Sequence, residues 1–123
     1  MNSESRNSGY SSVEKVNFCD RLLGNGNQSP DWSGPGWYRI EGPAGSMLPE
    51  QPVENYHCGT TVTGWLNGLH PVAVGQTVDR IVCFNADKDE CYLQTKIQVR
   101  NCGNYYLYNL KDTPGCYLRY CAE

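Results

Sequence analysis

The sequence contains no long hydrophobic run and no concentration of positive charge. No stretch approaches the roughly 18 apolar residues that a membrane-spanning helix needs. The ten lysines and arginines are scattered singly, and the formal net charge is −3, whereas nucleic-acid-binding domains carry a basic patch or stripe. We therefore expect no direct membrane insertion and no nucleic-acid partner.

Residues suited to catalysis are also scarce. The two histidines are His57, which adjoins Cys58, and His70, which precedes Pro71 in an expected turn. A hydrolase of the nucleophile-and-base type needs a nucleophile, a base and an orienting group, and no nucleophile elbow is present. We expect the chain not to be an enzyme and to have no catalytic residue.

The sequence lacks the motifs of common metal sites. The cysteines are spaced irregularly, without the paired C-x-x-C units of structural zinc sites. Asn85, Asp87, Asp89 and Glu90 bring oxygen ligands together, but the glycine and glutamate that a calcium loop needs at its sixth and twelfth positions are absent. We favour a solvated acidic hairpin tip, and we expect no metal and no cofactor.

Cysteine, glycine and proline are abundant. Seven cysteines, 13 glycines and seven prolines in 123 residues predict one small domain held by disulfides, which form in secreted and extracellular proteins. An odd count leaves one cysteine free or paired outside the chain. No signal peptide is present at the N-terminus, which we interpret as the start of an expressed fragment, so a secreted or extracellular location remains our expectation.

Short apolar-rich runs separated by turn residues dominate the chain after residue 36. We expect residues 1–13 to be a disordered tail and residues 14–123 to form a single cysteine-rich β domain, with at most one short helix over 13–23. The pattern predicts a mostly-β fold, either a small antiparallel β-sandwich or paired twisted sheets with long loops. The six expected strands are 37–40, 60–66, 77–84, 92–100, 105–110 and 117–120.

Aromatic residues are numerous, with nine tyrosines and three tryptophans. We expect Trp37 and Trp65 to pack in the core or in turns. Tyr105, Tyr106 and Tyr108 lie on one expected strand, where period-two geometry places Tyr106 and Tyr108 on one face and Tyr105 on the other. Because we expect one of these faces to meet solvent, the three tyrosines are the candidate binding surface.

A series of short motifs resembles the eight-cysteine domain of uromodulin-type glycoproteins, over about residues 18–121. The motifs follow the order of that family and are GWYRI at 36–40, GPAG at 42–45, CGT at 58–60, WLNG at 65–68, HP at 70–71, RIVC at 80–83, QV at 98–99 and YC at 120–121. Two family cysteines are missing, because Pro52 and Glu90 stand in their places.

The resemblance implies a disulfide pattern. It pairs Cys19 with Cys116, Cys58 with Cys121, and Cys83 with Cys91, and it leaves Cys102 unpaired. In longer relatives the cysteine matching Cys102 pairs with one upstream of this segment, which would explain the odd count.

The resemblance also implies a function. It suggests a non-enzymatic extracellular recognition or adhesion module from a larger secreted or surface mosaic glycoprotein, in matrix or mucosal defence, with a protein or glycan ligand. The alternatives are a carbohydrate-binding lectin and a rigid spacer without a ligand. Family members often carry a glycan on the asparagine of the WLNG turn, but Asn67 is followed by Gly68 and Leu69 and so lacks the acceptor motif.

Overall fold

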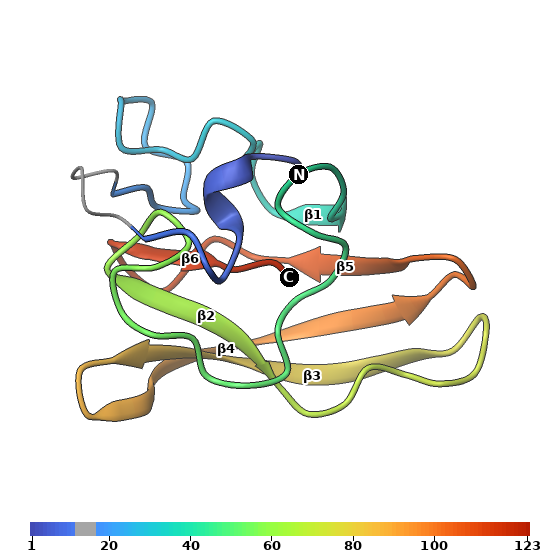
Figure 1. The fold of residues 1–123 in the computed structure, drawn as a ribbon. Coiled ribbons are helices and arrows are strands. Elements are labelled where there is room, and N and C mark those ends of the chain that lie inside the picture. Colours follow the sequence, from blue (N-terminus) through green and yellow to red (C-terminus); the bar gives the residue numbers. More distant parts are fainter. Residues whose placement is uncertain (12–16) are drawn as a thin grey trace.

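A computed structural model describes residues 1–11 and 17–123 of the chain, and the fold is mostly β (Figure 1). Within these residues the elements are the 3-10 turn η1 (Glu4–Arg6) and the strands β1 (Gly36–Arg39), β2 (Val62–Asn67), β3 (Thr77–Ala86), β4 (Asp89–Asn101), β5 (Tyr106–Leu110) and β6 (Leu118–Tyr120). The mostly-β fold predicted from the sequence is confirmed, and each expected strand corresponds to one of these six.

The strands form one curled sheet in the order β1-β5-β4-β3-β2-β6. Four neighbouring pairs are antiparallel, and β2 and β6 are parallel. The arrangement differs from a sandwich of two sheets because residues 111–117 carry the chain from β5 to the opposite edge, where β6 joins β2. The long loops then pack onto the curled sheet in place of a second sheet (Figure 1).

The main core lies on the concave face of the sheet. Along β4, buried Ile97 and Val99 alternate with exposed Lys96, Gln98 and Arg100, as expected for a strand with one face in the core. The core on the concave face also takes side chains from the loops before β1 and β2, and its largest members include Trp32, Tyr38, Leu48, Leu66, Phe84, Tyr108 and Tyr120. The other face of this part of β4 is therefore open to solvent.

A smaller hydrophobic cluster covers part of the opposite, outer face. Trp65 of β2 lies opposite Cys83 of β3 in the register, and both pack with Val53, Cys58 and Cys121. The loop before β2 therefore covers the outer side of β2 and β3.

The N-terminal residues are ordered against the sheet, so the prediction of a disordered tail is wrong for residues 1–11. Asn7 forms a parallel bridge with Ala122, and the Arg6 side chain is fully buried. The segment is polar, and it packs through hydrogen bonds and ion pairs that its sequence alone does not reveal. Of the helix predicted over 13–23, residues 13–16 lie outside the described residues, and 17–23 contain no helix.

Candidate functional site

Three disulfides hold the ends and the hairpin of the domain. They join Cys19 to Cys116, Cys58 to Cys121 and Cys83 to Cys91, which are the pairs that the resemblance implied. The first closes a loop of 97 residues and the third a loop of 8 residues. Together they tie the loop before β1, the loop before β2 and the β3–β4 hairpin to the rest of the domain.

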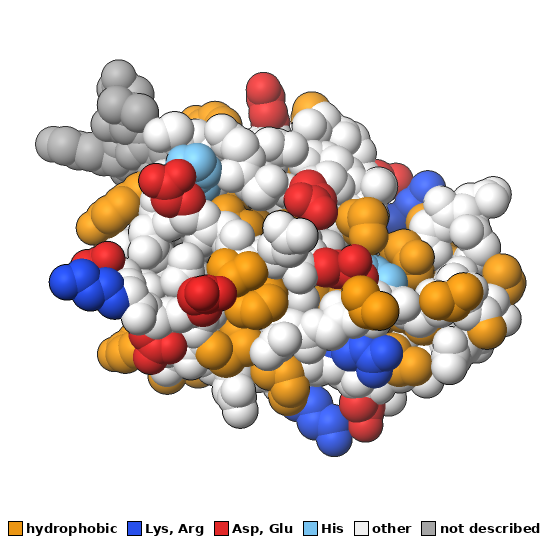
Figure 2. Space-filling view, turned by 60° about the horizontal axis from the view of Figure 1, so that its bottom comes forward, with side chains coloured by type: hydrophobic (Ala, Val, Ile, Leu, Met, Phe, Trp, Pro, Cys, Tyr) orange, Lys and Arg blue, Asp and Glu red, His pale blue; other side chains and the backbone are white. Residues whose placement is uncertain are grey.

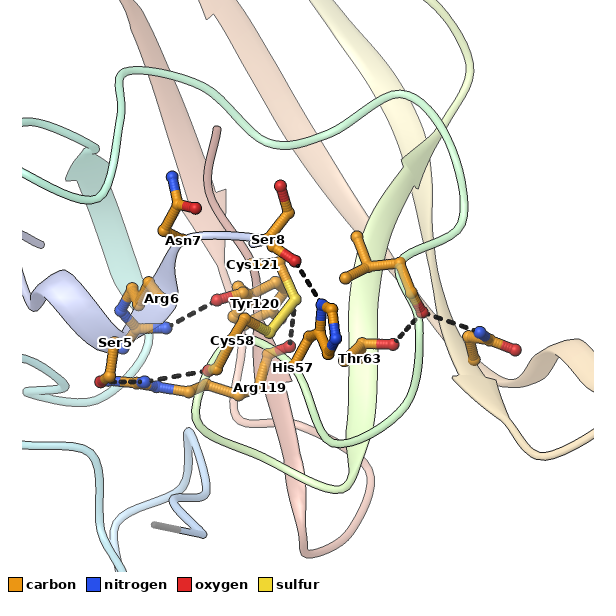
Figure 3. The surroundings of a disulfide bond; sticks show 12 residues. Ser5, Arg6, Asn7, Ser8, His57, Cys58, Thr63, Arg119, Tyr120 and Cys121 are labelled. Carbon is orange, nitrogen blue, oxygen red and sulfur yellow. Dashed lines mark hydrogen bonds between the residues drawn. A yellow bond between two sulfur atoms is a disulfide. The ribbon is translucent and has the colours of Figure 1, made fainter. Parts of the chain in front are cut away.

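The Cys58–Cys121 disulfide is surrounded by contacts to the N-terminal segment (Figure 3). Arg119 donates from Nη1 to the Cys58 carbonyl at 3.0 Å and to Ser5 Oγ at 2.7 Å. His57 donates from Nδ1 to the Ser8 carbonyl at 2.7 Å. His57 thus has a structural role as an anchor of the N-terminal segment.

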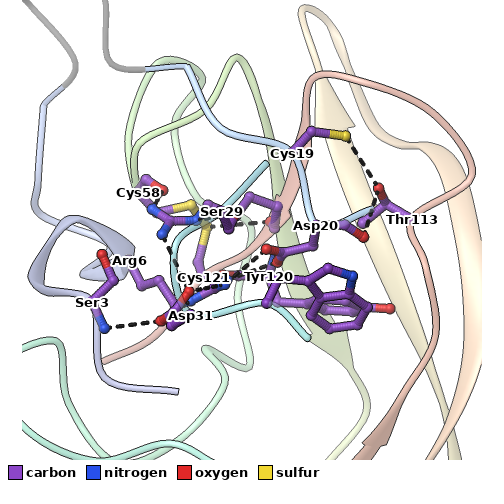
Figure 4. Close-up of polar contacts among 12 residues, drawn as sticks. Ser3, Arg6, Cys19, Asp20, Ser29, Asp31, Cys58, Thr113, Tyr120 and Cys121 are labelled. Carbon is purple, nitrogen blue, oxygen red and sulfur yellow. Dashed lines mark hydrogen bonds and ion pairs between the residues drawn. A yellow bond between two sulfur atoms is a disulfide. The ribbon is translucent and has the colours of Figure 1, made fainter. Parts of the chain in front are cut away.

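Arg6 of this segment, Arg119 of β6 and two aspartates form a buried ion cluster, part of which is labelled in Figure 4. Arg6 binds Asp20 through both terminal nitrogens at 2.7 Å, and its Nε donates to Asp31 at 2.8 Å. Arg119 Nη2 lies 3.6 Å from Asp31 Oδ1. The Tyr120 backbone N–H donates to Asp20 Oδ2 at 2.9 Å. The cluster therefore joins the N-terminal segment, the loop before β1 and β6.

The charges in this cluster shift one another's pKa values. Burial alone would raise the pKa of Asp31, but Arg6 outweighs it and holds that pKa well below its ordinary value. Burial alone would lower the pKa of Arg6, but Asp20 and Asp31 raise it. Burial and the neighbouring charge of Arg6 lower the pKa of Arg119 to about 9. Arg6, Asp31 and Arg119 are therefore charged at neutral pH.

The predicted tyrosine surface is only partly exposed. Tyr108 is completely buried, so its assignment to a binding surface is wrong. Tyr106 is half-buried against the core, and Tyr105 lies half-buried with the Arg39 guanidinium 4.1 Å from its ring centre. The strand alternates as predicted, but Tyr106 and Tyr108 face the core because the loops pack on that face.

Tyr108 belongs to a buried hydrogen-bond network with the second histidine. The two ring nitrogens of His70 each make one contact at 2.7 Å, Nδ1 with Glu50 Oε2 and Nε2 with the Tyr108 hydroxyl. The Leu48 N–H donates to the same hydroxyl at 3.1 Å. The hydrogen bond to His70 lowers the pKa of Glu50, and burial raises that of Tyr108. With its hydroxyl buried and bonded, Tyr108 positions His70 and is not accessible to a substrate.

The 69–74 loop, which follows β2, exposes large apolar side chains. Leu69, Val72 and Val74 are 71%, 90% and 75% exposed. The base of the loop is fixed by buried His70 and by Asn101, whose Nδ2 donates to the carbonyls of residues 71 and 72 at 2.8 and 3.1 Å. Figure 2 shows hydrophobic side chains gathered on this side of the molecule, with acidic side chains beside them. Exposed apolar groups on a fixed backbone are typical of a protein-binding surface.

Two features near the surface were not recognised as exposed from the sequence. Trp37, expected in the core or a turn, is 49% exposed, because it faces outward on β1 while Tyr38 faces the core. The 69–74 loop carried a signal, since Leu69, Val72 and Val74 are apolar residues outside any expected strand. Cys102, which has no disulfide partner, lies half-buried in the turn beside this loop.

Neither a metal-ligand cluster nor a membrane-spanning helix occurs in the part of the chain that the structure describes. No group of three or more potential metal ligands occurs there. Nor is there a helix of the length and apolar character needed to cross a membrane.

Comparison with known proteins identifies relatives of the domain. Residues 38–122 match the family described as the uromodulin-like domain. The pancreatic secretory granule membrane major glycoprotein GP2 is 39% identical in Rattus norvegicus over 92 residues and in Canis lupus familiaris over 99 residues, which are 72% and 80% of this chain. Uromodulin of Rattus norvegicus is 39% identical over 89 residues, 72% of this chain.

The matched regions are small parts of these relatives. They make up 17% and 19% of the two GP2 proteins and 14% of uromodulin, so the chain spans less than a fifth of the length of these relatives. The family match extends from β1 into the residues that follow β6 and includes both cysteines of two of the three disulfides. The chain therefore belongs to the family of uromodulin-like domains.

Proposed function

We propose that the chain is a non-enzymatic recognition module of a larger secreted or extracellular glycoprotein, and that it binds a protein ligand through the 69–74 loop. The exposure of Leu69, Val72 and Val74 carries this proposal. Three disulfides and membership of a family whose relatives are named as glycoproteins support the extracellular assignment.

The chemistry of the loop favours a protein over a sugar as its ligand. Its exposed side chains are apolar and offer no hydrogen-bond donor or acceptor to a hydroxyl group. Its backbone is held by Asn101, and the backbone N–H of His70 donates to Glu50 at 2.6 Å. Binding therefore orders little further backbone, which reduces the entropic cost of association.

The test is a screen of the folded, oxidised domain, displayed as a multimer, against an array of purified secreted and cell-surface ectodomains. We expect at least one ectodomain to bind, and Val72→Ser with Val74→Ser to weaken that binding at least about tenfold, because two apolar contacts are lost. Leu22→Ser, which removes a side chain that is 59% exposed elsewhere, is the matched control.

Two results would contradict the proposal. Equal binding by the wild type and the loop variant would place the contact elsewhere. Absence of binding to every ectodomain, with the fold intact by circular dichroism, would favour a rigid spacer.

A further inference from the structure

We propose that the outer face of β1, β5 and β4 is a binding site for an anionic saccharide. This inference rests on the proposed function as a recognition module, but it concerns a different surface from the 69–74 loop. The face is defined by the outward residues Trp37 and Arg39 of β1, Leu107 and Asn109 of β5, and Gln98 and Arg100 of β4, together with Lys96 and Lys111 at one end.

The strand register arranges these side chains in two rows across the sheet. In one row Trp37 lies opposite Asn109, which lies opposite Gln98. In the next, Arg39 lies opposite Leu107, which lies opposite Arg100. Directly opposed residues place their side chains about 5 Å apart on the same face. The rows thus form a nearly continuous surface of aromatic, amide and cationic groups.

This surface has no layer of the described chain packed over it. The loop before β2 covers the outer side of β2 and β3, around Trp65, whereas Trp37, Arg39, Gln98 and Arg100 are all exposed. Trp37 is 49% exposed, whereas the other two tryptophans of the chain, Trp32 and Trp65, are buried. This half-exposed indole is the first indication of a ligand surface.

Positive charge gathers on this face of an otherwise acidic chain. The net charge of the chain is −3, yet the face carries Arg39, Arg100, Lys96 and Lys111. Arg39 pairs with exposed Glu41 at 3.7 Å. Lys96 pairs at 3.3 Å with exposed Asp79, which lies opposite Gln98 in the register of β3 and β4. Among the described residues, no carboxylate forms an ion pair with Arg100 or Lys111. The surface therefore has uncompensated positive charge for an anionic ligand.

The remaining groups match the chemistry of a saccharide. A shallow hollow of about 250 Å³ is lined by the polar residues Gln98, Asn109, Lys96, Lys111 and Asp79. The one carboxylate among them, Asp79, is already paired with Lys96. Side-chain amides both donate and accept hydrogen bonds, as sugar hydroxyls do, and Asn109 already donates to Gln98 at 3.2 Å. The indole of Trp37 offers an apolar surface for the C–H face of a sugar ring. Arg100 and Lys111 would bind its sulfate or carboxylate groups.

The test measures binding of four hexameric probes by isothermal titration calorimetry. A heparin hexasaccharide carries sulfate and carboxylate groups, a hyaluronan hexasaccharide carries carboxylates alone, maltohexaose is neutral, and hexaglutamate is anionic without sugar rings. We expect at least one anionic saccharide to bind more tightly than maltohexaose and hexaglutamate. The comparison of heparin with hyaluronan identifies the acidic group, and affinity should fall as salt is raised.

Single substitutions locate the site. We expect Trp37→Ala to weaken saccharide binding about tenfold and Lys111→Gln about threefold, because they remove a stacking surface and a charge-assisted contact. Tyr56→Ala and Lys88→Gln are the matched controls, since Tyr56 and Lys88 are exposed away from the face. Trp37→Phe keeps an aromatic ring, so it should retain part of the affinity and guards against a general loss of fold.

The outcomes separate this inference from the proposed function. Binding that is unchanged in Trp37→Ala and Lys111→Gln would overturn the site, and equal binding of hexaglutamate would assign the face to acidic peptides. No binding of either anionic saccharide would also overturn it, while ectodomain binding through the 69–74 loop would still stand. Conversely, Val72→Ser with Val74→Ser should leave saccharide binding unchanged.

Discussion

Arg6 shows how much of the N-terminal structure depends on single side chains. It stands among serines and asparagines, where composition alone predicts disorder. Its partners Asp20 and Asp31 lie 14 and 25 residues further along the chain, and no local pattern links them. Sequence reasoning therefore missed the ion cluster, because a salt bridge between distant residues is visible only after the chain has folded.

Removing the charge of Asp31 should destabilise the domain. Asp31→Asn leaves Arg6 and Arg119 buried with less compensating charge, and we expect the free energy of unfolding to fall by about 3 kcal/mol. Glu41→Gln is the control, because it removes the carboxylate of an exposed arginine pair and should cost less than about 1 kcal/mol. Urea unfolding measures both variants, and equal losses would show that burial of the cluster contributes little.

The strands were the most predictable elements. Alternation of apolar and polar residues located β4 and assigned Ile97 and Val99 inward, as the structure confirms. Alternation also separated Tyr105 from Tyr106 and Tyr108, but it did not show which face meets solvent. That choice depends on the loops that pack on the concave face, and their path is not encoded in strand periodicity.

The disulfides should differ in their contributions to stability. The Cys83–Cys91 bridge closes 8 residues and the Cys19–Cys116 bridge closes 97. The chain-entropy relation gives about 2.5 kcal/mol for the short loop and about 4.7 kcal/mol for the long one. Replacing each pair by alanines and measuring urea unfolding should therefore show the larger loss for Cys19 with Cys116. A larger loss for the hairpin pair would indicate that packing around Trp65 outweighs loop closure.

At the scale of the whole molecule, the carboxylates predict sensitivity to acid. The folded protein holds Asp31 and Glu50 below their ordinary pKa values of 3.8 and 4.5. The unfolded chain therefore takes up protons first as the pH falls, which favours unfolding. The stabilisation is present above those ordinary values and is lost progressively below them.

Chemical denaturation between pH 7 and pH 2 measures this dependence. We expect the free energy of unfolding to change little down to about pH 5 and then to fall by up to about 1.4 kcal/mol per pH unit for Asp31. Asp31→Asn should flatten the acidic part of the profile. The same slope in the variant would assign the acid sensitivity to other carboxylates.

The overall architecture could be predicted only in part. The number of strands and their approximate positions along the chain followed from the sequence pattern, and the disulfide pairs followed from the resemblance. The single sheet did not, because placing β6 beside β2 depends on the crossover of residues 111–117. Trp37 likewise was expected in the core or in a turn, and its outward position on the edge strand β1 exposes it.

The parallel bridge between Asn7 and Ala122 has a mechanical consequence. Tension applied to the two chain ends would pull these segments in opposite directions along their length, so their hydrogen bonds and the Arg6 ion pairs would be loaded in shear. Once they part, the Cys19–Cys116 bridge would carry the force around the 97-residue loop. Only the short segments outside that bridge, which include β6, would come under load, and β1 to β5 with their outer face would stay folded.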